Sequence, residues 1–318
     1  MIFAVAFAGA IFASGAGDSQ ARPQATTTPR IAELGIALPA IGGRQGPRYF
    51  KKYFSPAVMQ DIRDNLHATY VRTGWRPDGL AFESQRWRRE DRELDAICSA
   101  GLHAMIIVPS PRDDKNGNED LIANVAEFFS RYTQREPGCV RYAEIANEAD
   151  LRANGFSDVK EYAAFYLRVA PIVARLGVRV LTSGTSGSDL PWTETLASIL
   201  RGADPSAPVG GFGFHPYGVV PALMPHEMSV MRAAVGVAAD GSIPEVYVTE
   251  IGQKRAADLY QTIVNLAPST PTITIYEYMA QPEENPEYGL KNNPELYQAV
   301  QRAWATITAS ASPAGPFP

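Results

Sequence analysis

The chain is poor in the residue types that mark several common protein classes. Its 318 residues include only two cysteines, Cys98 and Cys139, and only four histidines. The two cysteines lack the close pair spacing of a zinc site, so they predict either one disulfide or two buried thiols. Basic residues do not outnumber acidic ones, and the formal net charge of −5 argues against nucleic acid as a partner. No stretch approaches the roughly 20 apolar residues of a membrane-spanning helix, so we expect no membrane contact in the mature protein.

Motifs for three other kinds of chemistry are also missing. Residues 210–213 read Gly-Gly-Phe-Gly and lack the third glycine of a dinucleotide-binding turn. Residues 183–188 contain no Gly-x-Ser-x-Gly elbow, which disfavours an esterase. His226 has no second histidine at metal-ligand spacing. We therefore expect neither a cofactor nor a metal.

The ends of the chain differ in composition from its middle. An apolar run over residues 2–13 is followed by small residues, although no lysine or arginine precedes it. We interpret residues 1–21 as a signal peptide, with a buried first helix as the alternative, and residues 22–30 as a linker. Residues 310–318 are small residues and proline, typical of a disordered tail. This organisation predicts a secreted or periplasmic protein.

Between these ends, strand-like and helix-like patterns alternate eight times. Short β-branched runs are each followed by an amphipathic segment, which indicates parallel strands covered by helices. The expected strands are residues 31–38, 68–72, 103–108, 140–146, 178–183, 211–215, 245–250 and 272–278. Eight such units predict a single-domain α/β fold, a (β/α)₈ TIM barrel over residues 31–309, with an open doubly wound sheet as the runner-up.

Two glutamates stand where strands end. Residues 141–150 read Arg-Tyr-Ala-Glu-Ile-Ala-Asn-Glu-Ala-Asp, which delivers Glu148 straight after an apolar strand, and Glu250 ends the strand expected at 245–250. In parallel barrels the chemistry is done at the C-terminal ends of the strands. Cleavage of a glycosidic bond requires two carboxyl groups that flank the scissile bond. The two glutamates therefore predict a paired-carboxylate active site.

Four segments resemble one enzyme group. Residues 144–150, Glu-Ile-Ala-Asn-Glu-Ala-Asp, resemble the E-I-W-N-E-P-D type motif of the retaining glycoside hydrolases of clan A. Residues 213–217 look like the strand-six H-x-Y element of that group, and residues 248–250 like its strand-seven nucleophile. Arg72 is similar to the arginine that the group places at the end of strand two. The resemblance touches most of the barrel in the correct strand order.

The resemblance implies a role for each matched residue. Glu148 would be the general acid/base and Glu250 the nucleophile of a retaining hydrolase that cleaves a poly- or oligosaccharide. Asn147 would bind the sugar 2-hydroxyl, while Tyr217 and Arg72 would keep Glu250 ionised. The remaining residues expected to bind the carbohydrate are His215, Tyr276, Glu277, Trp75 and Trp192.

Several positions depart from the pattern or allow a second interpretation. Ala146 replaces a common aromatic residue, and residues 276–278, Tyr-Glu-Tyr, replace the tryptophan that many members carry on strand eight, so the sugar stays open. Glu144 is expected to be an interior charge paired with a neighbour. Trp75 and Trp192 would either stack on sugar rings or cap the barrel.

Two other functions compete with hydrolysis. A non-catalytic sugar-binding barrel would keep the fold without turnover, but such proteins usually lose one of the two glutamates. A lyase or isomerase acting on a sugar acid would need a lysine or histidine base, often with a metal, and the predicted mouth offers only His215 as a base.

Overall fold

The computed structural model describes residues 32–42, 47–76, 83–112, 118–203, 207–238, 241–280 and 286–311. The predicted signal peptide (1–21) and linker (22–30) lie outside these residues, as do positions 312–318 of the predicted tail. None of the helices within the described ranges is long and apolar enough to cross a membrane.

The centre of the molecule is one parallel sheet. Its strands are β1 (Glu33–Gly42), β2 (Tyr70–Arg76), β3 (His103–Val108), β4 (Val140–Ile145), β5 (Arg179–Thr182), β6 (Thr185–Ser186), β7 (Phe212–His215), β8 (Val246–Ile251) and β9 (Thr272–Ile275). They pair in the order β5-β4-β3-β2-β1-β9-β8-β7-β6. Strands such as β8 are apolar along most of their length and buried at every position, because helices cover the outer face of the sheet.

The two edges of this sheet meet. β5 corresponds to the strand expected at 178–183, and β6 lies beyond that expected range, after Ser183 and Gly184. A parallel bridge joins Leu181 to Gly211, where the amide of Thr182 donates to the carbonyl of Gly211 at 3.0 Å. β6 then continues the pairing along β7. Eight strands therefore close into the predicted (β/α)₈ barrel.

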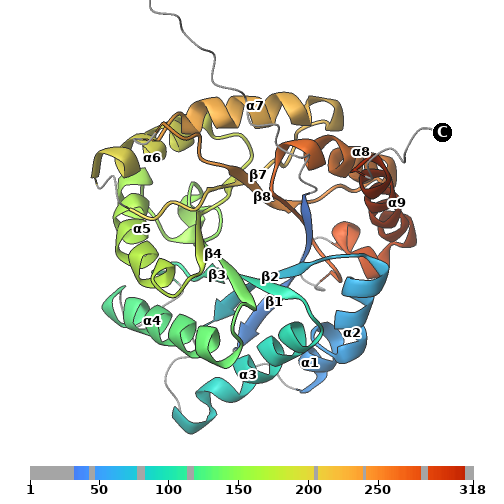
Figure 1. Ribbon diagram of the computed structural model, residues 1–318, viewed down its shortest axis with the longest axis horizontal. Coiled ribbons are helices and arrows are strands. Elements are labelled where there is room, and N and C mark those ends of the chain that lie inside the picture. Colours follow the sequence, from blue (N-terminus) through green and yellow to red (C-terminus); the bar gives the residue numbers. More distant parts are fainter. Residues whose placement is uncertain are drawn as a thin grey trace, which may run out of the picture.

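Helices surround the barrel (Figure 1). They are α1 (Pro47–Tyr53), α2 (Pro56–Gln60), α3 (Glu83–Ser99), α4 (Asn118–Arg135), α5 (Val159–Ala174), α6 (Leu190–Ala203), α7 (Met224–Val235), α8 (Ala256–Leu266) and α9 (Pro294–Ala311). The sequence pattern missed α1. Short turns of 3₁₀-helix also occur at Arg152–Asn154, Pro221–Leu223, Ala267–Ser269, Pro286–Tyr288 and Leu290–Asn292, and α2 continues as a π-helical turn over Asp61–Asn65.

The barrel interior is filled from the end opposite the predicted site. Tyr70, Met105, Tyr142, Leu181 and Tyr247 form a separate buried cluster inside the ring of strands. Two glycines make room for the tyrosines, since a Cβ on Gly35 or Gly211 would lie 2.2 Å from a tyrosine ring. Because these side chains fill the N-terminal half of the barrel interior, a cleft can open at the C-terminal end.

The fold brings the two cysteines into contact. Cys98, near the end of α3, and Cys139, just before β4, are joined in a disulfide with their Cα atoms 5.7 Å apart. The bond closes a separation of 41 residues and lies at the N-terminal end of β4, away from the cleft. Of the two possibilities that the sequence left open, the disulfide is the correct one.

Candidate active site

Glu148 and Glu250 come together at the C-terminal end of the barrel. One carboxylate oxygen of each, and one ring nitrogen of His215, lie within 4.8 Å of one another. Glu148 follows β4 and Glu250 lies near the end of β8, so the barrel brings together residues that are far apart in the sequence. The pairing predicted from the two strand ends is present in the structure.

The backbone around Glu148 is held in an unfavourable conformation. Ala146 has φ 65° and Glu148 has φ 44°, both in the left-handed region that non-glycine residues seldom occupy. Neighbouring hydrogen bonds keep it there, because the Ala146 amide donates to the Val108 carbonyl at 3.1 Å and Asn154 Nδ2 donates to the Glu148 carbonyl at 3.1 Å. Such conformations cluster at functional sites, where the surrounding structure imposes them.

Arg72 joins the acidic groups into one network. It enters from β2, is 2% exposed, and donates Nε–H to Glu144 at 2.7 Å, Nη1–H to Glu250, and Nη2–H to Asn147 Oδ1 at 2.6 Å. Burial by itself would lower the pKa of Arg72, but the charges of Glu144 and Glu250 outweigh it and raise that pKa. The guanidinium is therefore a permanent positive charge between the two carboxylates.

Tyr217 supplies the second donor to Glu250. Its hydroxyl donates to Oε1 at 2.6 Å, while Arg72 donates to Oε2. Burial raises the pKa of Tyr217, and the charge of Glu250 raises it further, so the phenol stays protonated and remains a donor. Each oxygen of Glu250 thus accepts one hydrogen bond.

His215 lies behind the glutamates and is completely buried. Its Nδ1 is 3.2 Å from Glu148 Oε1, and its Nε2 is 3.1 Å from Thr249 Oγ1 and 3.5 Å from Glu144 Oε1. Burial lowers the pKa of His215, but the charge of Glu250 and hydrogen bonds with Glu144 and Glu148 raise it more, to about 9. His215 therefore contacts Glu148 directly but does not line the cleft.

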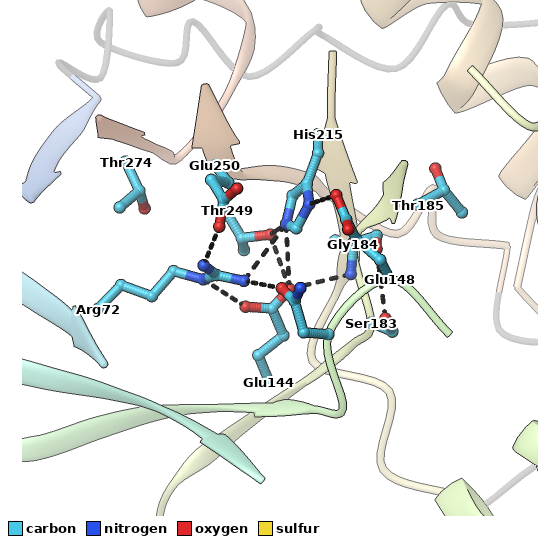
Figure 2. A network of polar contacts seen from close by, with 12 residues as sticks. Arg72, Glu144, Glu148, Ser183, Gly184, Thr185, His215, Thr249, Glu250 and Thr274 are labelled. Atoms are coloured by element: carbon cyan, nitrogen blue, oxygen red, sulfur yellow. Dashed lines mark hydrogen bonds and ion pairs between the residues drawn. The ribbon is translucent and has the colours of Figure 1, made fainter. Parts of the chain in front are cut away.

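Glu144 is the innermost carboxylate and has no solvent exposure. It accepts from Arg72, from the Gly184 amide at 2.9 Å and from Thr249 Oγ1 at 2.9 Å. Burial would raise the pKa of Glu144, yet the charge of Arg72 and the hydrogen bond with His215 lower it to about 2. Figure 2 shows Arg72 and His215 converging on this carboxylate from β2 and β7. The prediction of a paired interior charge is confirmed.

A cleft of about 820 Å³ opens above this network. Eight of the ten predicted site residues line it, namely Arg72, Trp75, Asn147, Glu148, Tyr217, Glu250, Tyr276 and Glu277. Tyr276 and Glu277 line it from the segment after β9, where a cis peptide bond joins the two residues.

The two tryptophans are not placed for stacking on a sugar. Trp75 reaches the cleft wall but is only 2% exposed, and its ring packs on Phe128 with the centroids 4.5 Å apart. Trp192 lies on α6, packs on Tyr162 with the centroids 6.2 Å apart, and does not line the cleft. For both residues, the geometry matches the capping alternative.

Sequence reasoning left two contributors unassigned. Tyr288 lines the cleft and contacts Tyr217 and Tyr276 edge-on, with ring centroids 6.5 and 6.1 Å away. Its signal in the sequence is an aromatic residue in the loop after the last strand. Thr249, next to Glu250, bridges Glu144 and His215. A threonine inside a buried strand carries no comparable signal.

Solved structures share this architecture. The chain shares the fold of clan A glycoside hydrolases. A GH39 enzyme from Xanthomonas axonopodis pv. citri matches with a TM-score of 0.69 and 15% identity, over 87% of this chain and 67% of the other. A GH39 β-xylosidase from Caulobacter crescentus matches with a TM-score of 0.67 and 15% identity, over 87% and 72%. An endoglucanase from the hyperthermophilic Thermotoga maritima matches with a TM-score of 0.61 and 13% identity, over 84% and 96%.

Sequence comparison finds no counterpart, because neither a protein-family model nor a curated protein matches the chain. At these low identities the structural likeness establishes the fold. The chemistry has to be argued from the site itself.

Proposed function

We propose that the protein is a retaining glycoside hydrolase that cleaves O-glycosidic bonds by double displacement. The observation that carries the proposal is the pair of carboxylates, Glu148 and Glu250, with one oxygen of each within 4.8 Å of the other. Retaining enzymes hold their carboxyl groups about 5 to 5.5 Å apart, whereas inverting enzymes leave about 6.5 to 9.5 Å for a water molecule. The short separation supports the retaining mechanism.

The surroundings of the two glutamates differ in the way that this mechanism requires. Glu250 accepts hydrogen bonds from Arg72 and Tyr217, which favour an ionised nucleophile. Glu148 is more exposed to the cleft and faces the ring of His215. In the first step Glu250 attacks the anomeric carbon while Glu148 gives its proton to the departing oxygen. In the second step Glu148 takes a proton from water, which attacks the anomeric carbon and releases Glu250.

Asn147 and the tyrosines would hold the sugar in this reaction. Asn147 lines the cleft beside Glu148, and its Oδ1 is held by Arg72, which leaves the Nδ2 hydrogens to be given to a sugar hydroxyl. Tyr276 and Tyr288 add aromatic surface in place of the missing strand-eight tryptophan. A substrate of the poly- or oligosaccharide class also agrees with the names of the structural neighbours, a β-xylosidase and an endoglucanase.

We also propose that the protein works outside the cytoplasm. The disulfide between Cys98 and Cys139 supports this, because such bonds persist mainly in oxidising compartments. The apolar N-terminal segment, residues 1–21, would direct export.

Azide rescue of two variants tests the assignment. Aryl glycosides with acidic phenol leaving groups need little acid assistance, so Glu148→Ala should still form the glycosyl-enzyme, and azide should release it with retained configuration. Glu250→Ala cannot form that intermediate, so azide should give the inverted product. Glu245→Gln, at the opposite end of β8, is the matched control and should behave as wild type.

Other outcomes would change the roles of the two glutamates or favour one of the competing functions. A reversed stereochemical pattern would exchange the roles of the two glutamates. Turnover that is lost with a chelator would favour a metal-assisted lyase or isomerase. Binding of a polysaccharide without turnover of any glycoside would identify a sugar-binding barrel.

A further inference from the structure

The site holds more charge than double displacement requires. Three carboxylates, Glu144, Glu148 and Glu250, surround the guanidinium of Arg72 and the ring of His215. The proposed mechanism gives a task to two of the carboxylates and to Arg72. It leaves Glu144 and His215 without one.

The hydrogen bonds around Thr249 constrain the ring of His215. Thr249 Oγ1 donates its hydrogen to Glu144 Oε1 at 2.9 Å, so it presents a lone pair to His215 Nε2 at 3.1 Å. Glu144 Oε1 itself lies 3.5 Å from the same nitrogen. Nε2 therefore faces a negative charge and an acceptor, and a hydrogen on Nε2 satisfies both, although the Arg72 Nη2 donor also lies 3.4 Å from this nitrogen. The other nitrogen, Nδ1, faces Glu148 Oε1 at 3.2 Å.

The local backbone supports this arrangement. Gly184 donates its amide to Glu144, and a Cβ at this position would lie 2.3 Å from His215 Nε2. The break between β5 and β6 thus brings a side-chain-free residue against both members of the pair. Glu144 and His215 are both fully buried, so no solvent screens their attraction.

We propose that Glu144 is a positioning residue that keeps His215 protonated on both ring nitrogens, so that His215 donates Nδ1–H to the ionised form of Glu148. That form exists once Glu148 has given its proton to the leaving group, and an adjacent imidazolium stabilises it. The inference rests on the proposed function for the role of Glu148. The charge of His215 itself can be measured without substrate.

Some of the groups around the His215 ring favour its protonation and others oppose it. The charged and titratable side chains that face His215 are Arg72 from β2, Glu144 from β4, Glu148 after β4, Tyr217 after β7 and Glu250 from β8. Arg72 opposes protonation of the ring, and the three carboxylates favour it. Burial also opposes it, yet the balance raises the pKa of His215 to about 9. Glu144 is the carboxylate that has no other part in the mechanism.

Nuclear magnetic resonance of the histidine side chains tests the proposal directly. The chain has four histidines, and the signal missing from His215→Asn identifies His215. In the wild type we expect both nitrogens of this ring to stay protonated from about pH 5 to 8. If His215 of the wild type titrated with a midpoint below pH 7, the proposal would be overturned, whatever the variants do.

Two variants test the role of Glu144. Glu144→Gln removes a buried unit charge 3.5 Å from Nε2 of His215. It should lower the midpoint of the His215 titration by about two pH units or more. Thr249→Val keeps all three carboxylates and should lower it by about one unit, so it tests the same contact if Glu144→Gln fails to fold. Glu245→Gln makes the same chemical change outside the site and should leave the midpoint in place. An unchanged midpoint in both site variants would refute the proposal.

Activity gives the functional readout. Loss of the imidazolium beside Glu148 should move the basic limb of the pH–rate profile to higher pH in Glu144→Gln and in His215→Asn. A uniform fall in rate with a fixed basic limb would mean that Glu144 only supports the fold. Absence of any glycoside turnover in the wild type would defeat the proposed function while leaving the measured charge of His215 intact.

Discussion

Replacing Tyr217 with phenylalanine removes one hydrogen bond from the site and almost nothing else. The hydroxyl donates to Glu250 Oε1 at 2.6 Å, and Glu250 is only 8% exposed, so water cannot easily replace it. The ring keeps its edge-on contacts with His215 and Tyr288. The variant is therefore expected to fold normally.

The size of the effect follows from the kind of bond. A hydrogen bond to a charged group contributes about 1.5 to 3 kcal/mol, and one pH unit corresponds to about 1.4 kcal/mol. Loss of this donor should therefore raise the acidic limb of kcat/KM by about one to two pH units. At a pH below both limbs, Tyr217→Phe should turn over about ten to a hundred times more slowly than wild type.

The measurement is kcat/KM against pH for wild type and Tyr217→Phe on the same glycoside. Tyr260→Phe is the matched control, because Tyr260 bonds to Thr306 between α8 and α9, away from the cleft. Thermal unfolding of all three proteins checks that the fold is intact. A rate reduced equally at every pH, with the acidic limb unmoved, would show that Tyr217 does not act by keeping Glu250 ionised.

Three further predictions concern stability and substrate binding. Despite burial, the pKa of Glu144 is lowered from 4.5 to about 2 and that of His215 is raised from 6.5 to about 9. The free energy of unfolding, measured by urea titration, should therefore be greatest between about pH 4.5 and 6.5. It should fall by about 3 kcal/mol on the acidic side as Glu144 is protonated, and by about 3 kcal/mol on the basic side as His215 loses its proton. A plateau extending well outside that window would contradict this. Reducing or replacing the Cys98–Cys139 disulfide, which spans 41 residues, should cost about 4 kcal/mol in the same assay, and an unchanged midpoint would count against the bond. Tyr288→Ala should raise KM for oligosaccharides about tenfold or more with little change in kcat, whereas an unchanged KM would place the sugar elsewhere in the cleft.

The sequence predicted the site well where the fold leaves little choice. In a parallel barrel every strand end points to the same mouth, so locating the ends of β4, β7 and β8 was enough to bring Glu148, His215 and Glu250 together. Arg72 followed from the same logic on β2. Arg72, His215 and Glu250 lie on strands, which fix the direction of their side chains, whereas Glu148 lies beyond β4.

The tryptophans were harder, because the sequence does not reveal whether a ring on β2 or α6 faces the cleft or the neighbouring helices. Trp75 and Trp192 occupy suitable places in the sequence, yet one ring faces Phe128 and the other Tyr162. The disulfide could not be chosen over free thiols either, since pairing depends on a Cα separation that spacing does not reveal.

The interruption between β5 and β6 affects how easily the sheet opens locally. Several neighbouring strands are held by ladders of four or more residue pairs, as between β1 and β2 or β4 and β5, whereas β7 and β8 share three pairs and β8 and β9 two. Between the fifth strand and β7 the pairing consists of the Leu181–Gly211 bridge and the two pairs of β6 with β7. Regions with few backbone hydrogen bonds open locally at lower free energy than the rest of a fold. Amide hydrogens along this seam, like those between β8 and β9, should therefore exchange earlier than those of β1 to β5. Because Gly184 lies in the seam, each opening there would loosen the packing around Glu144 and His215.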